Sequence, residues 1–249
     1  RYNDTGILNA AFGVSALYNT TTGSYNTATG VYALYNNTTG SYNTASGLDA
    51  LRANSTGNLN TATGTNALYY NTEGCYNAAF GAHALYNTTT GCDNTALGYY
   101  AGSNIRTGTN LTAIGYCALP SSSSATNEIT LGDSNIATIR SNTQTISSLS
   151  DERDKTEIED LPLGMEFLRT LRPIKFKWQR RDESDQNGSY EAGFIAQELL
   201  QAQEMSDAEY LNMVLTTNPE RLEASYGKLL PVVVQALKDI DKRVSNLEG

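Results

Sequence analysis

Lysine is absent from the first 150 residues of this 249-residue chain, and charge of either sign is scarce there. That part holds four basic and six acidic side chains, a net charge of −2. Residues 151–249 hold thirteen basic and twenty acidic side chains, a net charge of −7, and the two parts sum to −9. An acidic balance argues against nucleic acid as a partner, because phosphate binding requires clustered lysine and arginine. The shift in composition predicts two domains, residues 1–150 and 151–249.

Other residue types are rare in the whole chain. His83 is the single histidine, so a histidine-based metal site or catalytic triad would lack partners, and we expect a packing or solvent-facing role for it. No apolar run approaches the roughly 20 residues that span a bilayer, and no signal-peptide pattern opens the chain. We therefore expect no metal, no cofactor and no membrane insertion. Because Arg1 falls inside a repeat unit, we also expect the chain to be the C-terminal part of a longer protein.

A 17-residue repeat fills the first domain. Each unit has two glycines, which allow tight turns or positive φ, and short segments that alternate small or apolar with polar residues, as brief half-buried strands do. A unit this short cannot bury a core alone, so we predict a parallel β-solenoid of eight coils, roughly 38 Å long at about 4.8 Å per coil. Its interior should contain a column of leucines, namely Leu17, Leu34, Leu51, Leu68 and Leu85.

The repeat units resemble the head repeats of trimeric autotransporter adhesins, which carry a small-residue–Ala–apolar–Gly motif. The nearest matches are Ala96-Leu97-Gly98 and Ala113-Ile114-Gly115. The resemblance covers roughly residues 3–135 and implies a left-handed parallel β-roll with three chains in one rod. Similar repeats also occur in phage and virus fibres. Several asparagines begin N-x-S/T triplets, among them Asn19, Asn37, Asn54, Asn87 and Asn110, and we interpret these as turn residues rather than glycosylation sites.

Two of the three cysteines lie one repeat apart. Cys75 and Cys92 each follow a glycine of the second series, so they should occupy neighbouring coils with their Cα atoms about 5 Å apart, within the range of a disulfide. The alternative is two reduced thiols, because stacked side chains point the same way. Cys117 has no partner on this register, and three cysteines are too few to indicate an oxidising compartment.

After the junction the pattern changes from repeats to mixed helices and strands. Pro162 can open a short helix that ends before Pro173. Residues 174–179 alternate apolar and polar side chains, including Trp178 and Gln179, and predict a half-buried strand. A turn at residues 185–188 and a returning strand at residues 190–194 would complete a hairpin, and a helix should follow from about residue 193.

The last segment carries a heptad pattern. Apolar residues are spaced 4-3-4-3-4-3, which is typical of a coiled-coil seam: Tyr226, Leu230, Val233, Leu237, Ile240, Val244 and Leu247. We predict a trimeric coiled-coil helix over about residues 229–248. The alternative is an amphipathic helix that packs on its own domain.

Three motifs occur in order in this part of the chain: SDERDK at residues 150–155, GFIAQEL at residues 193–199 and YGKLLP at residues 226–231. With them, residues 148–249 resemble the intramolecular chaperone domain of phage tailspikes and fibres, of which endosialidase tailspikes are the best-known members. A related domain occurs in the myelin regulatory factor. The resemblance implies a domain that trimerises, templates the folding of the β-structured stalk ahead of it and then releases itself by autoproteolysis.

The resemblance assigns the nucleophile to Ser150 and the base to Lys155, with a single-turnover cut between Ser150 and Asp151. Such a dyad needs no histidine, because a desolvated lysine with a lowered pKa can remove the serine proton. Arg153 and backbone amides are candidate donors to the oxyanion, and Asp151 either assists or simply fits the site. Attack on the Leu149 carbonyl would instead leave Ser150 on the released chaperone. A domain that trimerises without cutting is the remaining alternative.

We therefore expect a homotrimeric structural fibre, such as a viral or phage tail fibre located on the virion, that contacts a host-surface glycan or receptor. A bacterial surface adhesin stalk with a non-cleaving trimerisation domain, at the cell surface or outside the cell, is the main alternative. A self-cleaving transcription factor would need a basic domain before the junction, and residues 1–150 are near neutral. A glycan-degrading spike would need a pair of carboxylates, and the six acids of residues 1–150 are scattered over different units.

Overall fold

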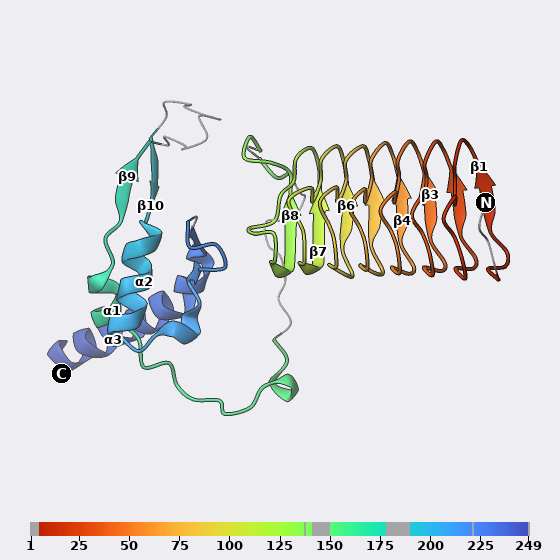
Figure 1. The fold of residues 1–249 in the computed structure, drawn as a ribbon. Helices are drawn as coiled ribbons and strands as arrows, with labels where there is room; N and C mark the ends of the chain where they lie inside the picture. The colour runs from red at the N-terminus through yellow and green to blue at the C-terminus, as the bar shows by residue number, and fades with distance from the viewer. Residues whose placement is uncertain (1–4, 137, 141–149, 178–189, 221, 249) are drawn as a thin grey trace. The chain divides into compact units, whose positions relative to one another are not determined.

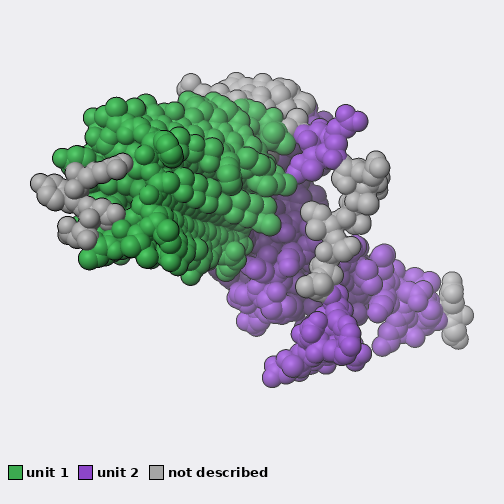
Figure 2. Space-filling view, turned by 90° about the vertical axis from the view of Figure 1, so that its right-hand side faces the viewer, with its two compact units in different colours: residues 1–136 green, residues 137–249 purple. Residues whose placement is uncertain are grey.

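The computed structural model describes residues 5–136, 138–140, 150–177, 190–220 and 222–248. The chain divides into two compact units, residues 1–136 and residues 137–249, which Figure 2 colours separately. The first unit is a parallel β-solenoid and the second is a small unit of helices and two short hairpins (Figure 1). The predicted fold class is confirmed; the left-handed sense and the trimer stay predictions.

One strand per coil builds a single eight-stranded sheet in which neighbours in sequence are neighbours in space (Figure 1). Every pair is parallel and in register at an offset of 17 residues, as in Ala28 opposite Ala45. The strands are β1 (Ala10–Phe12), β2 (Thr27–Thr29), β3 (Thr44–Ser46), β4 (Thr61–Thr63), β5 (Ala78–Phe80), β6 (Thr95–Leu97), β7 (Thr109–Ile114) and β8 (Thr126–Leu131). The 17-residue period of the sequence is therefore the path length of one coil.

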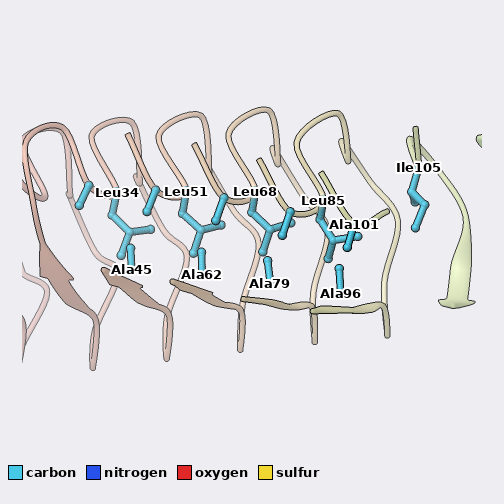
Figure 3. Close-up of a cluster of buried hydrophobic side chains, with 14 of the residues drawn as sticks. Leu34, Ala45, Leu51, Ala62, Leu68, Ala79, Leu85, Ala96, Ala101 and Ile105 are labelled. Atoms are coloured by element: carbon cyan, nitrogen blue, oxygen red, sulfur yellow. The ribbon is translucent and has the colours of Figure 1, made fainter. Parts of the chain in front are cut away.

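The core of the solenoid is a layer of alanines facing a layer of leucines (Figure 3). In β2 to β6 the middle residue is an alanine that is fully buried, as Ala62 is in β4. Leu34, Leu51, Leu68 and Leu85 come from the segment opposite the strands and are also fully buried. The predicted leucine column is confirmed. It ends at Gly102, where a leucine is missing and Ile105 enters the core instead.

The second glycine series is explained by close approach of neighbouring coils. A Cβ on Gly57 would lie 2.4 Å from the carbonyl oxygen of Gly74 in the next coil, which is far inside van der Waals contact. Positive φ instead falls largely on residues that are not glycine, including Leu34, Leu51 and Leu68 with φ of 50° to 52°. Close stacking therefore selects glycine at this position.

Two asparagine ladders run inside the solenoid. In one, Asn60 Nδ2 donates to Asn43 Oδ1 at 3.1 Å and to the Gly74 carbonyl at 2.8 Å, while its Oδ1 accepts the backbone N–H of Asn77 at 3.0 Å. In the other, Asn54 Nδ2 donates to Asn37 Oδ1 at 2.7 Å. Asn37 and Asn54 are fully buried. These two asparagines therefore have a structural role inside the core, in addition to the role in turns that the sequence predicted.

The C-terminal unit follows the predicted order of elements. Helix α1 (Met165–Thr170) precedes β9 (Ile174–Phe176), which pairs antiparallel with β10 (Glu191–Gly193), and α2 (Ala196–Met205) comes next. Helix α1 begins at Met165, three residues after Pro162, so it is shorter at its N-terminal end than predicted. Trp178, Gln179 and the predicted turn at residues 185–188 lie outside the described residues. A second hairpin joins β11 (Val214–Leu215) to β12 (Glu223–Ala224), and short 3₁₀ turns occur at Glu152–Asp154 (η1), Glu209–Leu211 (η2) and Tyr226–Leu229 (η3).

Helix α3 (Leu230–Glu248) has two apolar faces. Val232 is buried in the core of its own unit, together with Phe167 of α1 and Leu199 of α2, and Ala236 is buried as well. All seven residues of the predicted seam are exposed, among them Leu237, which is 60% exposed. The helix therefore packs on its own unit through residues outside the seam and presents the heptad seam outward, and the trimeric coiled coil stays a prediction.

Candidate functional site

The junction motif folds into one tight turn. Helix η1 is a single 3₁₀ turn, capped by the backbone N–H of Lys155, which donates to the Glu152 carbonyl at 3.1 Å. This turn reverses the chain, so that Lys155 returns to the residue before the turn. Lys155 Nζ donates to Ser150 Oγ at 2.7 Å and lies 3.4 Å from the Ser150 carbonyl oxygen. The structure thus brings together the two side chains that the resemblance assigned as nucleophile and base.

Asp151 and Arg153 hold this turn from its start. The Asp151 carboxylate accepts the backbone N–H of Arg153 at 2.9 Å, which makes it the N-cap of η1. It also accepts Arg153 Nε at 3.0 Å and the second guanidinium nitrogen at 2.6 Å, a bidentate ion pair. The Arg153 side chain, then its backbone N–H, hold the pKa of Asp151 below its ordinary value.

This clamp bears on the expected roles of both residues. Because the Arg153 guanidinium donates to Asp151, it is directed at the turn rather than at Ser150. Asp151 is thus a structural cap in this arrangement. An aspartate two residues before an arginine at the start of a turn is a signal that could have indicated this pair from the sequence.

The dyad is open to solvent. Ser150, Asp151, Arg153 and Lys155 are all exposed, and the residue before them, Leu149, lies outside the described residues. A lysine acts as a general base only in its neutral form, which burial favours and water disfavours. Within the described part of one chain, the geometry for proton transfer is present and the desolvation that such a base requires is not.

A comparison with known families finds a match that begins at the same residue. Residues 150–208 match the family model described as the chaperone of endosialidase. The chaperone match begins at Ser150 and includes the dyad, α1, the β9–β10 hairpin and α2, which is 59 of the 249 residues. No curated protein and no solved structure gives a significant match to the chain.

The two cysteines of the predicted disulfide do lie on neighbouring coils, but the structure has them as free thiols. Each thiol belongs to a column of side chains that accept a backbone N–H from the preceding coil. Cys92 Sγ accepts the backbone N–H of Cys75 at 3.1 Å, and Cys75 Sγ accepts that of Asn58 at 3.3 Å. The corresponding position of earlier coils holds Ser24 and Ser41, and Ser41 Oγ accepts the backbone N–H of Ser24 in the same way, so the thiols replace hydroxyls. Burial raises the pKa of Cys92.

His83 packs among aromatic rings. It stacks on Tyr100 with ring centroids 4.5 Å apart and meets Tyr86 edge-on. The described residues contain no group of three or more histidine, cysteine or acidic side chains that could hold a metal ion. Among the described helices, none combines the length and the hydrophobicity of a membrane span.

Proposed function

We propose that the protein is a homotrimeric structural fibre, part of a viral or phage tail or a similar host-contact appendage, with its folding chaperone at the C-terminus. The observation that carries this proposal is the order of the two parts, a parallel β-solenoid followed by a segment that matches the chaperone of endosialidase. The exposed seam of α3 supports the trimer, because an apolar heptad face open to water is stabilised by pairing with other copies.

A chaperone of this kind solves a kinetic problem of the solenoid. Each strand pairs only with residues 17 positions away, and chains rich in non-local pairing fold slowly while strand edges are exposed. Three chains that first associate through α3 raise one another's effective concentration and start from the same register. The solenoid can then form from the junction toward the N-terminus.

Self-cleavage at the junction is the second part of the proposal. Lys155 Nζ takes the proton of Ser150 Oγ, and the oxygen attacks the Leu149 carbonyl carbon. An ester forms, the bond to the Ser150 nitrogen breaks, and the nitrogen receives the proton; water then hydrolyses the ester and leaves Ser150 on the chaperone. For the predicted cut between Ser150 and Asp151, attack by the serine on its own carbonyl would close a strained four-membered ring. There the dyad would activate a water molecule instead.

Removal of the chaperone would make the fibre kinetically stable. The element that aligned the chains would be gone, so the solenoid could not unfold and refold by the same path. The reaction is intramolecular and happens once per chain, and therefore it requires no substrate pocket and no cofactor.

The test is intact mass measurement of the denatured protein beside two variants, Ser150→Ala and Lys155→Arg. Arginine keeps the positive charge and length but does not act as a base at neutral pH. We expect two fragments from the parent and a single chain from both variants. The fragment masses differ by one serine between the two possible cuts. A single 26.9 kDa species in all three samples would overturn cleavage and favour an adhesin-type stalk with a permanent trimerisation domain.

A further inference from the structure

The outer face of the solenoid sheet is uncharged between residues 10 and 116, and the next residue of its third column is Asp133. In each strand the residues on both sides of the buried alanine point outward, and a third outward column follows the strand-end glycine. Between residues 10 and 116 the columns are Ala10, Thr27, Thr44, Thr61, Ala78, Thr95 and Thr112; Phe12, Thr29, Ser46, Thr63, Phe80, Leu97 and Ile114; and Val14, Val31, Leu48, Thr65, Ala82, Tyr99 and Tyr116. We call these three columns the sheet face.

Between residues 10 and 116 the charged residues of the solenoid lie in other columns. Arg52 packs beside Tyr35 and Tyr69 on the segment opposite the strands, and Glu73 lies in the turn before Gly74. On the sheet face, in contrast, large apolar side chains are open to solvent: Phe12, Val14, Val31, Leu48, Phe80, Leu97, Tyr99, Ile114 and Tyr116. These apolar side chains gather in β1 and in β5 to β7, with threonine and serine between them, and an uncharged surface with several exposed large apolar side chains marks an interaction site.

The chemistry of the sheet face fits a second and third copy of the same solenoid. The seven strands β1 to β7, spaced about 4.8 Å apart, and five residues of about 3.3 Å each give a face of roughly 480 Å². This is about 60% of the roughly 800 Å² per partner of a standard interface. Identical faces repel one another when they carry like charges, and this face carries none within residues 10–116.

We propose that the sheet face is the surface through which three copies of the solenoid pack together. The inference rests on the trimer proposed above and adds which of its surfaces is buried. The segment that carries Tyr35, Arg52 and Tyr69, which lies across the coil from the strands, then faces outward.

Site-specific photocrosslinking in the full chain tests this arrangement. Phe80, 42% exposed on the sheet face, is replaced by p-benzoylphenylalanine, which keeps an aromatic side chain. The matched control places the same residue at Tyr70, which is 45% exposed and follows Leu68 on the opposite segment. Both proteins carry Ser150→Ala so that they remain uncleaved. Light scattering first measures the oligomeric mass, and irradiated samples are then separated under denaturing conditions.

We expect both proteins to be trimers, with crosslinked dimers and trimers at least fivefold more abundant from position 80 than from position 70. Equal yields, a larger yield from position 70, or no crosslinks from position 80 in a trimeric sample would overturn the assignment of the sheet face and leave the proposed trimer standing. Monomers in light scattering would overturn the proposed trimer itself, and the sheet-face interface with it.

Discussion

Individual leucines of the solenoid core combine an unfavourable backbone with a favourable side chain. Leu51 and Leu68 have φ of 51° and 52°, a left-handed conformation that costs a residue with a Cβ about 1–2 kcal/mol. Their side chains are fully buried, and burial of a leucine contributes about 1.5–3 kcal/mol. Gly102 adopts the same conformation, with φ of 62°, and gives up the side chain. Ile105 fills the space, since a Cβ on Gly102 would lie 3.1 Å from its Cδ1.

This exchange predicts an energetic coupling between the two positions. In an uncleaved Ser150→Ala background, Gly102→Leu alone should lower the free energy of unfolding by about 1–3 kcal/mol through overpacking. Adding Ile105→Thr, which copies Thr88 of the preceding coil, should recover at least half of that loss, because it empties the space that the leucine needs. Chemical denaturation of the two single variants and the double variant measures the coupling. Additive effects would show that the isoleucine does not replace the leucine.

At the scale of whole coils, the asparagine ladders link neighbouring coils by hydrogen bonds, as the leucine column links them by apolar packing. Asn60 joins its own coil to both neighbours through its side-chain amide, so the ladder satisfies backbone groups that would otherwise be buried without partners. Hydrogen bonds of this kind repeat at the same offset as the strands, and they make each coil depend on the next. Stability should therefore be transmitted along the stack.

Asn60→Ala should lower the free energy of unfolding by about 2–4 kcal/mol, because the Asn77 N–H, the Gly74 carbonyl and Asn43 Oδ1 lose a partner. The control is Asn36→Ala, which removes the exposed acceptor of Asn19 and should change stability by less than about 0.5 kcal/mol. Thermal unfolding followed by circular dichroism compares the two. A similar small shift in both variants would mean that the ladder adds no net stability.

The period of the repeat was sufficient to predict the stack and its core column, and the alternation of apolar and polar residues after residue 174 predicted the pairing of β9 with β10. Spacing alone could not reveal which residues take positive φ, because glycine and asparagine are the usual residues there and this solenoid uses Leu34 and Tyr42. Buried asparagine was equally hidden, since the same residue is common in exposed turns. At the site, residue order indicated Ser150 and Lys155, whereas the Asp151–Arg153 clamp depends on a local turn that no period describes.

For the molecule as a whole, each unit carries an apolar surface with no partner among the described residues of its own chain. In the solenoid this is the sheet face, and in the C-terminal unit it is the seam of α3. Val232, in the core of the C-terminal unit, and the buried Ala236 lie off the seam, so the seam can bind other copies without loss of the fold. A chain with two such surfaces is expected to associate in two stages, first through the helix and then along the solenoid.

Leu237→Asp should abolish the first stage, because three carboxylates would be buried together at the seam. Light scattering at micromolar concentration should show a monomer for this variant and a trimer for the matched variant Lys238→Asp, which places the same residue at an exposed position beside the seam. Circular dichroism checks that α3 remains helical in both. A Leu237→Asp protein that stays trimeric would show that the seam does not join the chains.

The constant register of the coils has a consequence for the evolution of fibre length. Removing residues 44–60 would join Asn43 to Thr61, and duplicating them would join Asn60 to a second Thr44. In both cases each position would still meet a neighbour from its own column. Length can thus change in steps of one coil, about 4.8 Å each, without redesign of any contact. A gain or loss of any other number of residues would shift every ladder beyond it, so recombination between repeats is the natural route by which such a rod becomes longer or shorter.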